Sequence, residues 1–166
     1  MPPHLPLPDD ATAGSELAAE YAAAREREGA VMAIQRAMGP RAELVRAFLA
    51  LADAALYGPA ALGRRERELL ALATSQANGA GYSAEVHAGL LDELGGGPDG
   101  GPRDRALVAF ARHLTLAPGE GGAAVADLRA HLSAAEAYDA IAVVGLLNHA
   151  NRAALASGIT SADDLA

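Results

Sequence analysis

Three residues in one short stretch of the chain, Glu68, Ser83 and His87, have side chains that together can move a proton. They flank Asn78-Gly79, a strong turn signal between two segments with helical periodicity. Glu68 lies 11 residues before Gly79 and His87 lies 8 residues after it, so an antiparallel helix pair, rising about 1.5 Å per residue, brings them to similar heights. Ser83 and His87 are four residues apart and share a helix face. The spacing predicts a carboxylate–imidazole–hydroxyl line, in which the carboxylate holds the imidazole in one tautomer and raises its basicity.

A purely structural interpretation of the same residues stays open at this point. Glu68 ends the charged run of residues 64–68 (RRERE), and such a run is usually a solvated helix face. His87 precedes the apolar stretch of residues 88–91 (AGLL), as a histidine of the core or of a subunit interface does. Spacing alone does not decide between the two interpretations.

These side chains need helices to position them, and the composition favours helices. Hydrophobic residues make up 51% of the 166 residues, and most of them are Ala and Leu. Ala and Leu are strong helix formers, while the β-branched residues that fill strands are scarce. A chain of this length also fits one domain with a sizeable core. The composition therefore predicts an all-α fold, a compact helical bundle.

Gly and Pro signals divide the chain into a Pro-rich N-terminal arm, residues 1–14, and a single helical domain, residues 15–166. Ser133 and Glu136 form a capping-box pattern, which predicts the start of a long apolar helix. The Gly-rich stretch of residues 95–102 lacks the Lys-Ser/Thr of a phosphate-binding loop, so we interpret it as a connection. Helices are expected over residues 15–28, 30–38, 42–57, 64–77, 82–94, 103–116, 123–132 and 133–158.

The charge and the lack of cysteine exclude several classes of function. The formal net charge is −8, and the 13 basic residues, all Arg, form no long run, so we expect no binding to nucleic acid. No apolar stretch reaches the roughly 18 residues of a membrane span, and no secretory signal is visible, so we expect a cytoplasmic protein that does not enter membranes. Without Cys, the chain has no disulfide, no thiolate metal site and no redox thiol.

The last expected helix carries a group of polar residues near its middle. Asn148 and Arg152 are four residues apart and His149 lies beside Asn148, so these side chains can face one pocket. We predict that Tyr82, Asn148, His149 and Arg152 line a pocket near the catalytic candidates. Hydrogen bonds to the backbone or to a neighbouring subunit are the alternative role of the three helix residues.

A metal site is the remaining chemical possibility. Glu68, His87 and His149 would supply two imidazoles and one carboxylate. No local pattern such as H-x-x-x-H or H-x-E requires such a site. We therefore predict no metal and no cofactor.

The segment of residues 64–87 resembles the core motif of the alkylhydroperoxidase D and carboxymuconolactone decarboxylase superfamily. In that motif a Glu precedes a C-x-x-C pair, and a His follows the second Cys by four residues. The spacing here matches throughout: twelve residues from Glu68 to Ala80, three to Ser83 and four to His87. Similar flanking segments of the branch called peroxidase-related are found at residues 44–51 (LVRAFLAL), 104–115 (DRALVAFARHLT) and 140–158.

This resemblance implies a bundle of the alkylhydroperoxidase D type, assembly as a homo-oligomer (trimer or hexamer), and peroxide reduction by the C-x-x-C thiolate with His and Glu moving protons. Both cysteine positions differ here: Ala80 has no nucleophile, and the Ser83 hydroxyl cannot follow the sulfenic acid and disulfide route. We predict a peroxidase-related protein that is inactive as a thiol peroxidase and keeps the Glu68–His87 pair in a small-molecule pocket. The alternatives are a non-redox proton-transfer enzyme acting on a small acid or lactone, and a non-catalytic oligomeric binding protein.

Overall fold

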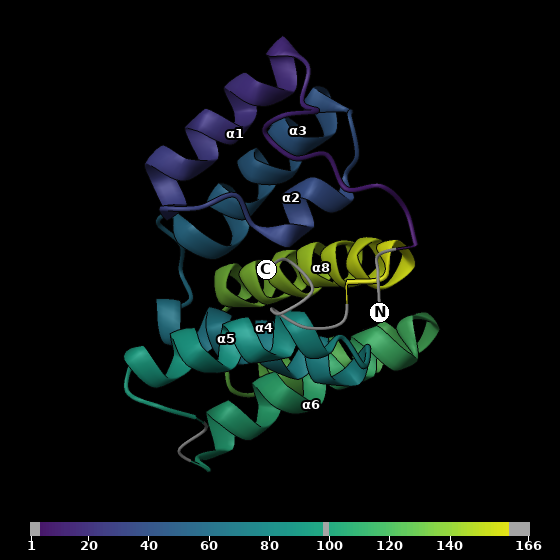
Figure 1. Cartoon of the computed structure of the whole chain (residues 1–166). Helices are drawn as coiled ribbons and strands as arrows, with labels where there is room; N and C mark the ends of the chain where they lie inside the picture. Colours follow the sequence, from purple (N-terminus) through teal and green to yellow (C-terminus); the bar gives the residue numbers. More distant parts are fainter. Residues whose placement is uncertain (1–3, 98–99, 160–166) are drawn as a thin grey trace.

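Helices joined by short turns make up the computed structural model, which describes residues 4–97 and 100–159 and contains no strand within them (Figure 1). The all-α prediction is confirmed. The helices are α1 (Ser15–Glu28), α2 (Ala33–Ala37), α3 (Ala42–Ala52), α4 (Arg64–Ala77), α5 (Gly81–Glu93), α6 (Pro102–Leu116), α7 (Gly121–Arg129) and α8 (Ala134–Ser157), with a π-helical turn η1 (Asp53–Tyr57) after α3 and a 3₁₀ turn η2 (Pro118–Glu120) before α7.

Helix α8 lies between two groups of helices, α1–α3 on one side and α4–α6 on the other (Figure 1). Its sequence explains this place, because a helix that is apolar on most sides has to be covered on most sides. Val143, Leu147 and Ala150 are among its buried residues. At its start the predicted capping box is formed: the amide of Glu136 donates to Ser133 Oγ at 3.3 Å, and the amide of Ser133 donates to Glu136 Oε2 at 2.7 Å.

Two apolar clusters hold the two helix groups. The larger one joins α4, α6 and α8 through side chains such as Leu70, Leu107 and Val143, none of which is exposed. The smaller one joins α1 to α3 through Leu17, Tyr21 and other buried residues. Helices α4 and α5, which carry the catalytic candidates, therefore both contribute residues to the larger cluster.

The helix expected over residues 42–57 changes its geometry before it ends. The amide of Gly58 donates to the carbonyl of Asp53 at 2.6 Å, which closes a wide π-helical turn. A Cβ on Gly58 would lie 2.7 Å from that carbonyl oxygen, so only glycine fits there, and Pro59 prevents further helix. Single π-helical turns are frequent at functional sites, and this one places Tyr57 on the lining of a cavity.

Two further expected helices differ from the structure by more than one residue at an end. The helix predicted over residues 30–38 is shorter, α2 (Ala33–Ala37), because the amide of Met32 is bonded by the Gln35 side chain at 2.9 Å instead of continuing a helix. The helix predicted over residues 123–132 begins and ends earlier, as α7 (Gly121–Arg129).

The described part of the predicted N-terminal arm lies against the helices. The amide of His4 donates to the carbonyl of Ser157 at 2.9 Å. The carbonyl of Pro8 accepts hydrogen bonds from the Tyr21 hydroxyl at 3.2 Å and from Arg36 Nη1 at 2.8 Å.

Parts of three predicted segments lie outside the described residues: 1–3 of the arm, 98–99 of the Gly-rich connection and 160–166 of the helical domain. Within the two described stretches, no helix is both long enough and apolar enough to cross a membrane.

Candidate active site

The α4–α5 hairpin brings the two main catalytic candidates together. Gly79, with φ of 67°, and the hydrogen bond from the amide of Ala80 to the carbonyl of Ser75, 3.0 Å long, form the turn between the helices. The antiparallel arrangement places His87 Nδ1 2.7 Å from Glu68 Oε2. This is the contact expected from the spacing of the two residues around the turn.

The Glu68 carboxylate is completely buried and both its oxygens have partners. Arg64, one turn earlier on α4, binds Oε1 through Nε at 2.8 Å and Nη2 at 2.6 Å. Burial raises the pKa of Glu68, but the hydrogen bonds and charges of His87 and Arg64 outweigh it, so the pKa of this carboxyl lies below its ordinary value of 4.5. Glu68 is therefore ionised at neutral pH.

The ionised carboxylate determines the tautomer of His87. A carboxylate only accepts hydrogen bonds, so Nδ1 carries the hydrogen of the neutral ring and Nε2 carries the lone pair. Among the described residues Nε2 has no hydrogen-bond partner, although the His87 residue is only 7% exposed. The ring is thus held on one side and open to proton transfer on the other.

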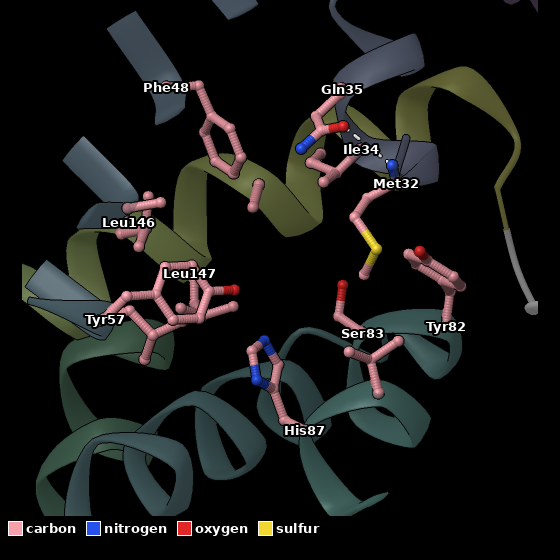
Figure 2. Close-up of a pocket in the computed structure, with 14 residues that line it drawn as sticks. Met32, Ile34, Gln35, Phe48, Tyr57, Tyr82, Ser83, His87, Leu146 and Leu147 are labelled. Atoms are coloured by element: carbon pink, nitrogen blue, oxygen red, sulfur yellow. Dashed lines mark hydrogen bonds between the residues drawn. The ribbon is translucent and has the colours of Figure 1, made fainter. Parts of the chain in front are cut away.

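Ser83 lies on the same face of α5 as His87, and it is also buried, with 8% exposed. No hydrogen bond joins its hydroxyl to His87, nor to any other group in the described part of the chain. Of the predicted carboxylate–imidazole–hydroxyl line, the structure therefore contains the contact between Glu68 and His87 but not one between His87 and Ser83. Residues four apart share a helix face, but here both side chains point toward a common cavity rather than toward each other (Figure 2).

This cavity has a volume of about 60 Å³ and lies where α5 faces α2, α3, η1 and α8. Its lining is mostly apolar, with Phe48, Leu146 and Leu147 opposite His87 (Figure 2). Such a space holds a few water molecules or one molecule of similar size. Drug-sized ligands occupy several hundred Å³, so only a very small molecule fits this arrangement of side chains.

Tyr57 is a cavity residue that the sequence analysis missed. It lines the cavity from η1, and the Arg64 guanidinium lies 4.6 Å from the centre of its ring. Arg64 thereby joins the cavity wall to the Glu68–His87 pair. The only local signal was the position of Tyr57 just before Gly58-Pro59, where the helix has to change its geometry.

Of the four predicted pocket residues, Tyr82 lines the cavity and the other three do not. Asn148 joins helices instead: it accepts from Asn78 Nδ2 at 3.1 Å and donates to Thr115 Oγ1 at 3.2 Å. Arg152 Nη1 donates to the carbonyl of Asn148 at 2.9 Å. Only the bond to the backbone is of the kind expected in the alternative role; the two side-chain bonds were not predicted.

His149 also faces away from the cavity of His87. Its ring centre lies 6.3 Å from that of Phe48, and it lines an open apolar groove with Leu44 and Leu51 of α3. In the described residues no group of three His, Asp or Glu side chains is placed to hold a metal ion. The set of Glu68, His87 and His149 is therefore not assembled.

The charged run of residues 64–68 is not the solvated face that one interpretation expected. Arg67 and Glu68 are buried, and Arg67 Nη1 donates to the carbonyl of Gly58 at 2.9 Å. Arg65 pairs with Asp104 of α6 at 2.8 Å. The other three residues of the run are half-buried, and several of the five bind groups on neighbouring elements, which the sequence pattern alone does not reveal.

Comparisons with known proteins agree with this architecture. Residues 42–100, which include Glu68, Ala80, Ser83 and His87, match the carboxymuconolactone decarboxylase family. No curated protein matches the chain.

Two similar crystal structures are of peroxidase-related proteins. One, from Ralstonia eutropha JMP134 and described as an alkylhydroperoxidase AhpD core, is 26% identical, with a TM-score of 0.79 over 98% of this chain and 93% of that one. The other, from Silicibacter sp. TM1040, is 25% identical, with a TM-score of 0.76 over 93% of this chain and 88% of that one. A debrominase crystallised with 2,3,4-tribromopyrrole shares the fold at 17% identity, with a TM-score of 0.72 over 91% of this chain and 88% of its own.

Proposed function

We propose that this chain is a peroxidase-related protein without thiol peroxidase activity, because residues 42–100 match the carboxymuconolactone decarboxylase family, the fold is alkylhydroperoxidase D-like and the chain has no cysteine. In this proposal the Glu68–His87 pair exchanges a proton with a very small molecule in the cavity. The observation that carries it is the unpartnered His87 Nε2 on the cavity wall, opposite the nitrogen that binds a buried carboxylate.

The missing thiols remove the redox step but leave the proton step. Thiol peroxidases need a thiolate that attacks the peroxide and a second thiol that closes a disulfide. Ala80, at the position of the first motif cysteine, is 3% exposed and has no nucleophile. A hydroxyl like that of Ser83 is not oxidised in this way. The Glu68–His87 contact depends on neither position.

Proton transfer at His87 follows from the electrostatics of the pair. A molecule with an acidic O–H or C–H donates its proton to Nε2, and the imidazolium that forms is stabilised by the Glu68 carboxylate at Nδ1. Arg64 keeps Glu68 ionised throughout, so the carboxylate orients the ring and does not take the proton itself. The Ser83 hydroxyl, also on the cavity wall, can bind the second polar atom of the molecule.

The test compares thiol-dependent peroxide consumption by the chain and by the Ala80→Cys/Ser83→Cys variant. We expect consumption by the variant alone, and a loss of about 10²-fold when His87→Gln is added, the usual size of a general acid–base contribution. Sustained, thiol-dependent consumption by the unaltered chain, beyond one equivalent per chain, would contradict the proposal. Inactivity of the double-cysteine variant, if it is folded by circular dichroism, would show that the site no longer supports family chemistry.

A non-redox enzyme acting on a small acid or lactone remains the second candidate, because the same unpartnered nitrogen suits it. Its signature is deuterium exchange at the α-carbon of a small lactone, followed by NMR. His87→Gln would abolish the exchange without unfolding the chain. Absence of exchange with the unaltered chain, together with unchanged His87 chemical shifts on adding the lactone, would leave the non-catalytic binding protein as the better description.

We also propose that the chain forms a homo-oligomer, a trimer or hexamer as the resemblance implies. Large apolar side chains are exposed on α8, where Tyr138 is 73% and Ile141 39% exposed, and on α3, where Leu44 is 45% exposed. Neighbouring exposed apolar residues of this kind mark association surfaces. Sedimentation equilibrium of the chain and of Ile141→Asp measures the assembly and its dependence on α8.

A further inference from the structure

One sulfur atom lies in the cavity although the chain has no cysteine. Met32, the residue before α2, lines the cavity together with Ser83 and His87. Figure 2 shows its thioether directed toward Ser83, into the space that His87 also faces. Of the two methionines that the structure describes, Met32 is the one on the cavity wall. A thioether is oxidisable, and it needs no ionisation to react.

Two polar groups beside Met32 point to a ligand with hydrogen-bonding oxygens. The Ser83 hydroxyl and His87 Nε2 both belong to residues more than nine-tenths buried, and neither atom has a partner in the described residues. Both groups face the cavity, where a bound molecule can reach them. A bound molecule with two oxygens satisfies both at once, and the cavity of about 60 Å³ limits it to a few atoms.

We propose that Met32 is the site at which small hydroperoxides, hydrogen peroxide above all, are reduced by oxygen transfer. This inference rests on the proposed proton exchange at the Glu68–His87 pair and names a substrate class for it. The nucleophile is the thioether of Met32 in place of the thiol that the chain lacks.

The step balances without a further reactant. The Met32 sulfur attacks one peroxide oxygen, a new S–O bond forms and the O–O bond breaks. The transferred oxygen loses its proton to His87 Nε2, and the departing oxygen gains that proton from the imidazolium and leaves as water. The sulfur is oxidised to the sulfoxide, and hydrogen peroxide is reduced to water. The reaction stops after one equivalent per chain, because the chain has no cysteine thiol that could reduce the sulfoxide.

Oxidation changes the cavity as well as the peroxide. The sulfoxide is polar and accepts hydrogen bonds, whereas the thioether is apolar. It stands next to the Ser83 hydroxyl, which is a suitable donor. In the oxidised chain the Ser83 hydroxyl therefore donates a hydrogen bond to the sulfoxide oxygen, and the cavity is more polar. The chain keeps this state until an external sulfoxide reductase acts.

The chain contains its own control in Met38. This residue is also partly buried, and it lines the open apolar groove beside α3 instead of the cavity of His87. Trypsin cleaves after Arg27, Arg36 and Arg41, so the two methionines fall in separate peptides. Mass spectrometry of peptides after timed exposure of the full chain to hydrogen peroxide gives the two oxidation rates side by side.

We expect Met32 to be oxidised at least about tenfold faster than Met38, and His87→Gln to remove most of that ratio while Met38 keeps its rate. Cumene hydroperoxide, which is too large for the cavity, is expected to oxidise Met32 no faster than Met38. Equal rates with hydrogen peroxide would overturn the proposal. So would a ratio that is unchanged in His87→Gln, since exposure alone would then explain it.

The outcome is separable from that of the proposed function. If Met32 is not oxidised preferentially, but the double-cysteine variant consumes peroxide in a His87-dependent way, the proton site is intact and only the Met32 proposal fails. If the double-cysteine variant is inactive and Met32 still reacts preferentially in a His87-dependent way, the Met32 proposal stands and only the expected thiol chemistry of the double-cysteine variant fails.

Discussion

Helix α4 carries two charged clusters that differ in what they leave unpaired. In the first, Glu66 and Glu136 both bind Arg103, each at 2.5 Å, and Arg103 Nη1 also donates to the carbonyl of His131 at 3.0 Å. In the second, two residues further along the chain, Glu68 is buried between Arg64 and His87. The first cluster is closed and partly exposed, and the second is buried and leaves one nitrogen facing a cavity.

The difference shows what distinguishes a structural ion pair from a site of chemistry. Arg103 joins the starts of α4, α6 and α8, its hydrogen bonds raise its own pKa, and together with the cap at Ser133 they lower the pKa of Glu136 to about 2. The charged groups of this first cluster all bind one another or the backbone, so none is left to bind a ligand. The Glu68–His87 pair satisfies the carboxylate completely but the imidazole only on one side. A functional role is available only to the second cluster.

The sharpest test of this comparison substitutes the two glutamates of α4 in turn. Glu68→Gln is expected to lower the free energy of unfolding by about 3 kcal/mol, because it leaves a buried pair broken. Glu66→Gln is expected to cost about 1 kcal/mol, because its partner Arg103 is partly exposed and keeps Glu136. Urea unfolding followed by circular dichroism at pH 7 measures both. Equal losses would contradict the distinction between the clusters.

The acid dependence of stability is the next test. A carboxyl whose pKa is lowered by folding binds fewer protons folded than unfolded, so its stabilisation is complete above its unfolded pKa and is lost as the pH falls through the folded pKa. Glu68 has such a lowered pKa, with an unfolded value near 4.5. We expect the unfolding free energy to decline below about pH 4.5, and less steeply in Glu68→Gln. Urea unfolding at pH 7, 5, 4 and 3 measures the slope; parallel slopes would show that Glu68 does not contribute.

The smallest effect is expected for Arg103→Met. Its ion pairs lie at a partly exposed junction, where such pairs contribute at most about 1 kcal/mol. Salt screens exposed charges, so the difference in unfolding free energy between the chain and this variant is expected to shrink in 1 M salt. A loss as large as that of Glu68→Gln, or one independent of salt, would place the two clusters in the same class.

Most of the local structure of this protein could be predicted from its sequence. The bounds of α1 and α4 agree with the expected residues 15–28 and 64–77. A glycine lies next to each end of α1, and glycines lie at or near both ends of α4, where they stop the helices. The contact between Glu68 and His87 also follows from local information, since a tight turn between antiparallel helices brings residues at similar distances from the turn to similar heights.

What the sequence by itself determined is thus the all-α class, most helix bounds, the absence of a thiol and the Glu68–His87 pair. Only the tertiary structure decided that Glu68 is buried, that Tyr57 and Met32 reach the same cavity as His87, and that Asn148, His149 and Arg152 do not. The reason is physical: helix periodicity and turn chemistry act over a few residues, whereas a cavity is formed where side chains from distant segments pack against one another.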